Sequence, residues 1–181
     1  MRTKGLIIFI DSGDTLVDES TEIRDEEGVV TEAKLFPGAG EAVRTLHRAG
    51  YRIALVADGL EASFRNIFRQ HGLECCFEAR AISESVGAEK PDPAMFRCAM
   101  EQMGLSDEDK GRIVMIGNNL ERDIRGANAM GIHSILAAYS PRYRMSPACL
   151  EEQPDFVAEE PSQIPKLVES LVDAIPNVPD L

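Results

Sequence analysis

A short apolar run near the N-terminus stops abruptly at a polar segment, and this junction constrains the fold of the chain. The run covers residues 6–10 (Leu-Ile-Ile-Phe-Ile) and is followed by Asp11, Ser12, Gly13 and Asp14. An unbroken apolar run rich in β-branched and aromatic residues predicts a strand buried on both faces, as in the centre of a parallel sheet. Ligands of open parallel sheets bind beyond the carboxyl ends of the strands, so Asp11 is placed for chemistry. Taken alone, the segment fits an ordinary turn equally well, because Asp and Gly terminate strands in many proteins.

Segments with strand and helix character alternate along the rest of the chain. Strands are predicted over residues 6–10, 53–57, 77–83, 112–116, 132–138 and 155–158, and helices over about 38–49, 60–71, 93–103, 120–130 and 162–174. This alternation predicts an α/β fold with a central parallel sheet and helices on both faces. Residues 19–34 predict a β-hairpin that overhangs the site, because two strand-prone pieces flank a turn containing Gly28. We expect one domain over residues 1–175 and a loosely held tail over 176–181.

The composition argues against two classes of partner. A formal net charge of -12 and a pI near 4.7 disfavour nucleic acid, which is usually held by clustered Lys and Arg. No stretch approaches the roughly 20 apolar residues of a membrane span, and the first apolar segment is too short for a signal peptide. We therefore expect a cytoplasmic protein without a membrane partner. The four cysteines lack metal-ligand spacing and are expected to be structural thiols.

Four polar segments lie at the ends of predicted strands or before predicted helices: residues 11–15, 57–59, 90–91 and 117–123. Their order and spacing resemble the haloacid dehalogenase (HAD) superfamily of hydrolases, in which four short motifs occupy these positions of a Rossmann-like fold. The segments Asp-Ser-Gly-Asp-Thr-Leu, Lys-Pro-Asp-Pro and Gly-Asn-Asn-Leu-Glu-Arg-Asp-Ile-Arg-Gly-Ala carry the resemblance, which covers nearly the whole chain. It implies a three-layer fold and a Mg²⁺-dependent phosphatase that works through an aspartyl-phosphate, although family membership alone does not fix the reaction.

The resemblance also implies roles for individual residues. Asp11 would be the nucleophile and a ligand of Mg²⁺, with the backbone carbonyl of Gly13 and the side chain of Asn118 as further ligands. Lys90 would offset negative charge between nucleophile and phosphate, and Asp123 would orient the metal ligands or Lys90. Cations are needed because a carboxylate that attacks phosphorus must approach a negatively charged group, and Mg²⁺ prefers oxygen ligands.

Backbone amides are expected to contact the phosphate, since such groups bind anions at turns and helix N-termini. The four expected donors are the amides of Ser12, Gly13, Asp58 and Gly59. Each side chain of the site has a structural alternative as well. Lys90 could be a solvated lysine before a turn, and Asp123 could be a first-turn acid that interacts with the helix dipole. At least one of Asn118 and Asn119 is expected to cap the helix that follows.

Five positions depart from the family pattern, and three of these departures weaken the expected activity. Gly13 stands where the phosphatases usually carry a second Asp that protonates the leaving group and activates water, a contribution of about 10² to 10⁴ in rate. Ala57 replaces a phosphate-binding hydroxyl, and Asn118 replaces a metal-binding carboxylate. Asp14 and Asp58 are carboxylates where the pattern has Gly and Asn. We hypothesise that they compensate, in which case one of them lies within about 5 Å of Asp11 or the metal.

No segment between residues 15 and 42 or between 59 and 90 is long enough for an inserted cap domain. An open site leaves substrate selection to the hairpin, to a neighbouring subunit of a homo-oligomer, or to a large partner that itself excludes water. The expected ligand is a phosphorylated small molecule or macromolecule. Dehalogenation is disfavoured, because the missing cap supplies its halide contacts. The alternative function is a catalytically impaired relative that binds a phosphorylated ligand or a protein partner.

Overall fold

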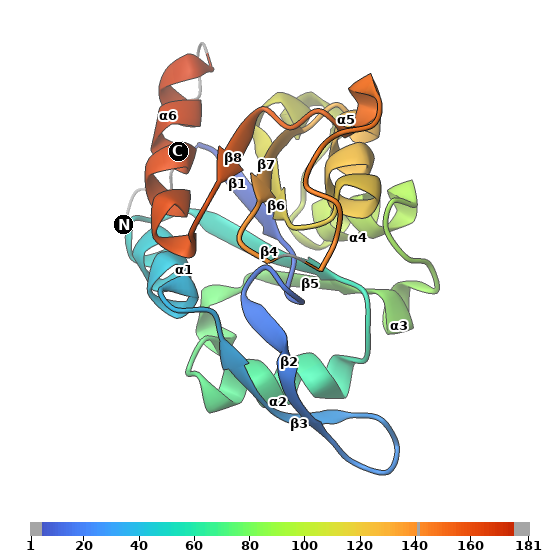
Figure 1. Ribbon diagram of the computed structural model, residues 1–181. Helices are drawn as coiled ribbons and strands as arrows, with labels where there is room; N and C mark the ends of the chain where they lie inside the picture. The colour runs from blue at the N-terminus through green and yellow to red at the C-terminus, as the bar shows by residue number, and fades with distance from the viewer. Residues whose placement is uncertain (1–4, 141, 176–181) are drawn as a thin grey trace.

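A six-stranded parallel sheet organises the protein, and its strand order is β5-β4-β1-β6-β7-β8. The computed structural model describes residues 5–140 and 142–175. The strands are β1 (Ile7–Ile10), β4 (Arg52–Ala57), β5 (Ala79–Ile82), β6 (Ile113–Gly117), β7 (His133–Ala137) and β8 (Phe156–Ala158). All neighbouring strands run parallel, and β1 lies between β4 and β6 (Figure 1). The predicted central position of the first strand is therefore confirmed.

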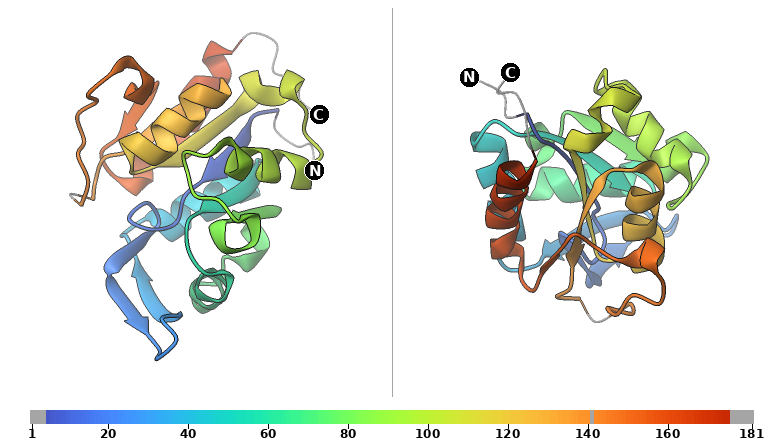
Figure 2. Two further views of the ribbon diagram at one scale, coloured as in Figure 1. Left: turned by 90° about the vertical axis from the view of Figure 1, so that its right-hand side faces the viewer. Right: turned by 90° about the horizontal axis from the view of Figure 1, so that it is seen from above.

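Helices cover both faces of the sheet. They are α1 (Ala39–Arg48), α2 (Glu61–Gln70), α3 (Ser83–Val86), α4 (Pro93–Gln102), α5 (Arg125–Met130) and α6 (Ile164–Ala174). One core joins α1, α2 and α6 to Ile8 and Ile10 of β1, and a second core joins α4 and α5 to Ile7 and Phe9. Successive side chains of a strand point to opposite faces, so the continuous apolar run of β1 contributes to both cores. The three layers are visible in Figure 2, and the predicted Rossmann-like architecture is confirmed.

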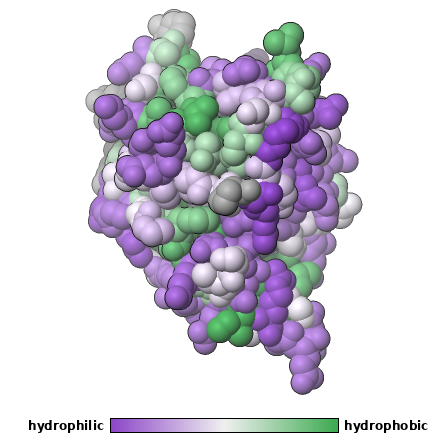
Figure 3. All heavy atoms as spheres, viewed as in Figure 1, coloured by the Kyte–Doolittle hydropathy of each residue, from purple (hydrophilic) through white to green (hydrophobic). Residues whose placement is uncertain are grey.

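A two-stranded antiparallel hairpin extends beyond the edge of the main sheet. It consists of β2 (Val17–Arg24) and β3 (Val30–Leu35), close to the predicted range of 19–34. The hairpin is fixed to α2 close to its turn, because the amide of Val30 donates to Ser63 Oγ at 2.9 Å and Asn66 Nδ2 donates to the Val30 carbonyl at 3.0 Å. The far end of the hairpin carries mainly hydrophilic residues (Figure 3). The hairpin is thus held against α2 at the start of β3, while residues 23–27 around its turn are exposed.

Several details of the fold differ from the sequence expectations or lie beyond them. The predicted helix at 120–130 begins with a turn of π-helix over Leu120–Ile124 before α5, and the short helix α3 was not predicted. The expected tail over residues 176–181 lies outside the described residues, and the single-domain organisation stays a prediction. Within the described part of the chain, no helix is both long and apolar enough to cross a bilayer.

Candidate active site

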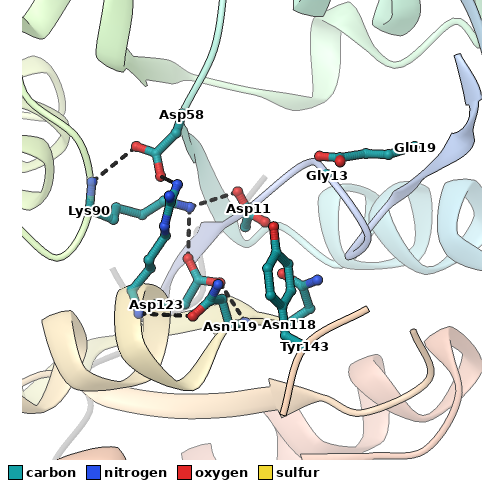
Figure 4. Close-up of a pocket in the computed structure, with 10 residues that line it drawn as sticks. Asp11, Gly13, Glu19, Asp58, Lys90, Asn118, Asn119, Asp123 and Tyr143 are labelled. Carbon is teal, nitrogen blue, oxygen red and sulfur yellow. Dashed lines mark hydrogen bonds and ion pairs between the residues drawn. The ribbon is translucent and has the colours of Figure 1, made fainter. Parts of the chain in front are cut away.

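A polar pocket lies beyond the carboxyl ends of the three central strands (Figure 4). Asp11 follows β1, Asp58 follows β4 and Asn118 follows β6, so the parallel topology alone brings these residues to the same edge. Lys90 reaches the pocket from the loop before α4, and Asp123 reaches it from the π-helical turn before α5. The pocket is lined by Asp11, Gly13, Glu19, Asp58, Lys90, Asn118, Asn119, Arg122, Asp123 and Tyr143.

Lys90 joins two carboxylates at the floor of this pocket. Its Nζ lies 2.6 Å from Asp11 Oδ1 and 2.7 Å from Asp123 Oδ1, and it also donates to the carbonyl of Val56 at 2.9 Å. The lysine side chain is only 2% exposed, so the structure excludes the alternative of a solvated lysine. Thr15 Oγ1 donates to the other oxygen of Asp11 at 3.2 Å. Asp11 is therefore held by a cation on one oxygen and by a hydroxyl on the other.

The pKa values of the cluster follow from burial and from the neighbouring charges. Burial is the strongest single influence on the pKa of Lys90 and acts to lower it, but the charges of Asp11, Asp123 and Asp58 together raise the pKa above its ordinary value. Burial raises the pKa of Asp123, an effect that Lys90 opposes and the negative charge of Asp11 increases. Lys90 is consequently a permanent cation beside two buried carboxyl groups.

Asp123 is positioned by its immediate surroundings as well as by Lys90. The amide of Asn119 donates to Asp123 Oδ2 at 3.0 Å, and a Cβ built on Gly117 would overlap the Asp123 carboxyl group. Asn119 caps the helical turn as expected, with its side chain accepting from the amides of Glu121 and Arg122 at 3.0 and 3.2 Å. The glycine that ends β6 leaves room for the acid, and the cap fixes the turn that carries it.

The predicted phosphate-binding amides do not all reach the pocket. Gly13 and Asp58 line it, whereas Ser12 and Gly59 line a neighbouring cavity under the hairpin. The expectation for Gly59 is corrected by its hydrogen bond, because its amide donates to Ser83 Oγ at 2.9 Å. An amide that is already bonded to a side chain is not a free donor for an anion.

The two carboxylates proposed to compensate for the missing acid have different positions. Asp58 lines the pocket, where its side chain accepts from the amide of Lys90 at 3.0 Å and lies 3.3 Å from Arg122 Nη1. Asp14 does not line the pocket; its Oδ2 lies 3.0 Å from Arg142 Nε. Asp14 is 4% exposed, and burial raises its pKa. Neither carboxylate points into bulk solvent, and the hypothesis that one of the two lies within about 5 Å of Asp11 or the metal stays a prediction.

Comparison with known proteins identifies the family to which this fold and site belong. A family model described as haloacid dehalogenase-like hydrolase matches residues 5–131, which is more than half of the chain. The chain belongs to the haloacid dehalogenase-like hydrolases. The resemblance inferred from the strand-end motifs is thereby confirmed.

Similar proteins within the HAD superfamily carry phosphatase or hydrolase names. The chain is 28% identical over 138 residues to a glyceraldehyde 3-phosphate phosphatase of Methanopyrus kandleri, covering 76% of this chain and 58% of that protein. It is 33% identical over 101 residues to a phosphoserine phosphatase of Thermus thermophilus, covering 56% and 39%. A putative HAD-hydrolase of Bacillus subtilis bound to magnesium has the same fold, with a TM-score of 0.65 at 21% identity and coverage of 75% and 56%. The chain thus spans about half the length of these relatives or less.

Three residues of this HAD pocket were not singled out from the sequence. Glu19 comes from the hairpin strand β2, Arg122 from the π-helical turn, and Tyr143 from the connection between β7 and β8. Arg122 adds a second cation, which is paired with Asp58 and is 45% exposed. Glu19 and Tyr143 lie outside the four motif segments, so no local pattern marks them. Arg122 lies within the fourth segment, but only the fold shows that it reaches the pocket.

The chemistry of the pocket fits the divalent cation that the HAD resemblance implies. Four lining side chains are carboxylates (Asp11, Glu19, Asp58 and Asp123) and two are cations (Lys90 and Arg122), so negative charge is in excess. Asn118 is 2% exposed, and its Nδ2 has no hydrogen-bond partner among the described residues. No hydrogen bond fixes the orientation of this amide, so its oxygen can face a metal. Within the described ranges, no three His, Cys, Asp or Glu side chains are grouped so that they could hold a metal ion. The expected ligand set differs from such a group, because Asp11 is its only carboxylate and the other two ligands are a backbone carbonyl and an amide oxygen.

Proposed function

We propose that this HAD-like protein is a Mg²⁺-dependent phosphatase that hydrolyses phosphate esters through a phosphoryl group carried on Asp11. The observation that carries the proposal is the buried contact of Lys90 Nζ with Asp11 Oδ1 at 2.6 Å, inside a pocket at the carboxyl end of the central strand. A buried lysine that retains its charge offsets the repulsion between a carboxylate nucleophile and a phosphate. The phosphatase names of the similar proteins agree with this proposal.

The reaction divides into two displacements at phosphorus. In the first, an oxygen of Asp11 attacks the phosphorus atom, the bond from phosphorus to the ester oxygen breaks, and the ester oxygen takes a proton from solvent water and leaves as the alcohol. In the second, a water oxygen attacks the phosphorus atom of the aspartyl-phosphate, and the bond to Asp11 breaks. Inorganic phosphate and the Asp11 carboxylate are the products. Lys90 keeps its proton throughout and contributes fixed positive charge.

Asp11, the carbonyl of Gly13 and the amide oxygen of Asn118 would hold the metal. Mg²⁺, when bound there, supplies positive charge that neutralises the phosphate oxygens. Asn118 in place of a carboxylate removes one negative charge from the ligand set, so we expect weaker metal binding than in a site with two carboxylate ligands. A magnesium-bound relative of the same fold supports the choice of metal.

The substrate is expected to be a phosphorylated small molecule or an exposed phosphoryl group on a macromolecule. No inserted cap domain is expected above the pocket, and Glu19 of the hairpin together with Tyr143 forms part of its wall. A homo-oligomer or a large partner could complete the enclosure of the site. The cytoplasmic location expected from the sequence stays a prediction.

A turnover assay tests the proposed function. Purified protein is incubated with p-nitrophenyl phosphate, phosphoserine, glyceraldehyde 3-phosphate and a phosphopeptide, with Mg²⁺ or with EDTA, and released phosphate is measured. We expect Mg²⁺-dependent release from at least one ester, reduced to background by Asp11→Asn. The matched control is Asp173→Asn, which removes an exposed carboxylate on α6.

Two results would contradict the proposed phosphatase. One is undiminished turnover by Asp11→Asn, and the other is the absence of metal-dependent turnover on every ester. In the second case, binding of phosphate measured by calorimetry would favour the alternative, a protein that binds phosphorylated ligands without hydrolysing them.

A further inference from the structure

The carboxylate of Glu19 fills the space beside Gly13 in which a side chain would begin. A Cβ built on Gly13 would overlap Glu19 Oε1 and would lie 2.8 Å from Glu19 Cδ. Figure 4 shows the Glu19 carboxylate beside Gly13. Both residues line that pocket. The position that lacks an acid in the sequence is therefore occupied in space by an acid from the hairpin.

Two contacts hold Glu19 in this place. Its amide donates to Asp14 Oδ1 at 3.3 Å, and its Oε2 is paired with Arg142. Arg142 is shared, since its Nε also lies 3.0 Å from Asp14 Oδ2. The arginine engages one carboxylate oxygen of Glu19 and leaves Oε1 on the side of Gly13. Asp14 thus positions the backbone of Glu19, and Arg142, from the connection between β7 and β8, positions its carboxylate.

The ion pair with Arg142 uses Glu19 Oε2, so Oε1 is the oxygen that lies on the side of Gly13. The oxygen of an ionised carboxylate accepts a proton and does not donate one. An ionised carboxylate suits the second displacement of the phosphatase reaction, in which water must lose a proton as it attacks phosphorus. It does not suit protonation of the leaving group in the first displacement.

We propose that Glu19 replaces the missing acid of position 13 and is the general base that activates water for hydrolysis of the aspartyl-phosphate. The inference rests on the proposed phosphatase function. In this step the water oxygen bonds to phosphorus, one water proton passes to Glu19 Oε1, and the bond between phosphorus and the Asp11 oxygen breaks with its electron pair returning to Asp11. The proton on Glu19 is then released to solvent. Arg142 is a positioning residue in this scheme, because it acts through Glu19.

Pre-steady-state kinetics with p-nitrophenyl phosphate separate this role from a structural one. The p-nitrophenolate group leaves without a proton donor, so Glu19→Gln should leave kcat/KM close to that of the wild type. We expect kcat to fall by about 10² to 10⁴, the usual contribution of a general base. The first turnover should then appear as a burst of p-nitrophenol equal in amount to the enzyme. Glu32→Gln, an exposed change on the other hairpin strand, is the matched control.

A pair of substitutions at residues 13 and 19 tests whether a carboxylate supplied from residue 13 can replace the one supplied by Glu19. In Gly13→Asp alone, the new side chain and the end of the Glu19 side chain would compete for the same space, so the change is made in two backgrounds. In the Glu19→Ala background this competition is removed, and Gly13→Asp should raise kcat at least tenfold above that of Glu19→Ala. A double variant no faster than Glu19→Ala would overturn the proposal.

The outcomes distinguish this inference from the function on which it rests. A kcat of Glu19→Gln equal to that of the wild type would overturn the role of Glu19, and so would equal losses of kcat and kcat/KM without a burst. In either case, Asp11-dependent turnover by the wild type would still support the phosphatase. Absence of Asp11-dependent turnover in the wild type would overturn both. Thermal unfolding of each variant identifies any loss that arises from misfolding.

Discussion

Lys90 shows how one side chain sets the charge of the candidate site. Its three ammonium hydrogens match three acceptors, on Asp11, Asp123 and the carbonyl of Val56. A buried ammonium is costly without such partners, and the two carboxyl groups are equally costly without the ammonium. Lys90 is therefore required for the fold of the site as well as for the proposed chemistry.

Replacement of Lys90 tests this dual role. We expect Lys90→Met to abolish turnover and to lower the free energy of unfolding by about 3–5 kcal/mol at pH 7, because two buried carboxylates lose their partner. The loss should shrink as the pH falls, since protonation removes the uncompensated charges. Urea unfolding at neutral and acidic pH measures both effects. Lys110→Met removes only a surface pair with Asp107 at 2.9 Å and should have little effect on stability.

A pH-independent loss of the same size in Lys90→Met would contradict this account. It would indicate that the lysine stabilises the fold through its aliphatic packing and not through its charge. A stable, fully active Lys90→Met protein would remove the electrostatic basis of the proposed mechanism.

At the scale of elements, the turn that follows β6 connects helix capping to the site. Asn119 accepts from two amides of the turn, and its own amide binds Asp123. We expect Asn119→Ala to lower the free energy of unfolding by about 1 kcal/mol, the usual cost of losing a cap. Turnover should fall as well, because the turn that carries Asp123 is loosened. Asn119→Asp keeps a capping oxygen and should retain most of the stability, as measured by thermal unfolding.

The start of β4 is joined to the segment before β5 by an ion pair with a testable pH dependence. Glu78 accepts from Arg52 Nε at 2.8 Å, and this hydrogen bond lowers the pKa of Glu78 below its ordinary value of 4.5, against the opposing effect of burial. A carboxyl group whose pKa is lower in the folded state stabilises that state at pH values above its unfolded-state pKa. This stabilisation is lost as the pH falls through the folded-state pKa.

Glu78→Gln should therefore be less stable than the wild type at pH 7 and should converge with it in acid. Because the Glu78 side chain is 43% exposed, solvent screening limits the expected difference at pH 7 to about 1 kcal/mol or less. Urea unfolding at pH 7 and at a pH below 4.5 measures the difference. A difference that persists unchanged in acid would show that charge is not its source.

The central strands could be predicted from the sequence because each is a short apolar run that ends at a polar segment. That pattern placed Asp11, Asp58 and Asn118 at one edge, where the structure has them. The hairpin was found within two residues, since its turn is marked by glycine. The π-helical start of the helix before α5 was missed, because side-chain periodicity does not resolve one turn of altered winding.

At the scale of the whole molecule, the position of Glu19 in the pocket depends on tertiary structure, and this residue was not singled out from the sequence. Glu19 reaches Gly13 only because the hairpin folds back over the end of β1, and Arg142 reaches Glu19 from a distant connection. Gly13 indicates a lost acid, and the sequence offers Asp14 and Asp58 as the substitutes. The structure places Asp14 beneath Glu19 as its support.

Overall charge and local charge both disfavour the binding of a phosphorylated ligand by the protein alone. The net charge of -12 repels an anion at long range, and the pocket itself has more carboxylates than cations. We therefore expect a phosphate group to bind more tightly when a cation joins it, which agrees with the proposed use of Mg²⁺. Metal and substrate are expected to bind cooperatively for this reason.

Direct detection of the phosphoryl group on Asp11 tests the central claim. Wild-type protein is mixed with Mg²⁺ and p-nitrophenyl phosphate, quenched in acid within the first turnover, digested and analysed by mass spectrometry. We predict one added phosphoryl group on the peptide that contains Asp11, sensitive to hydroxylamine and absent from Asp11→Asn. Release of phosphate without that adduct, or an adduct that persists in Asp11→Asn, would contradict the account.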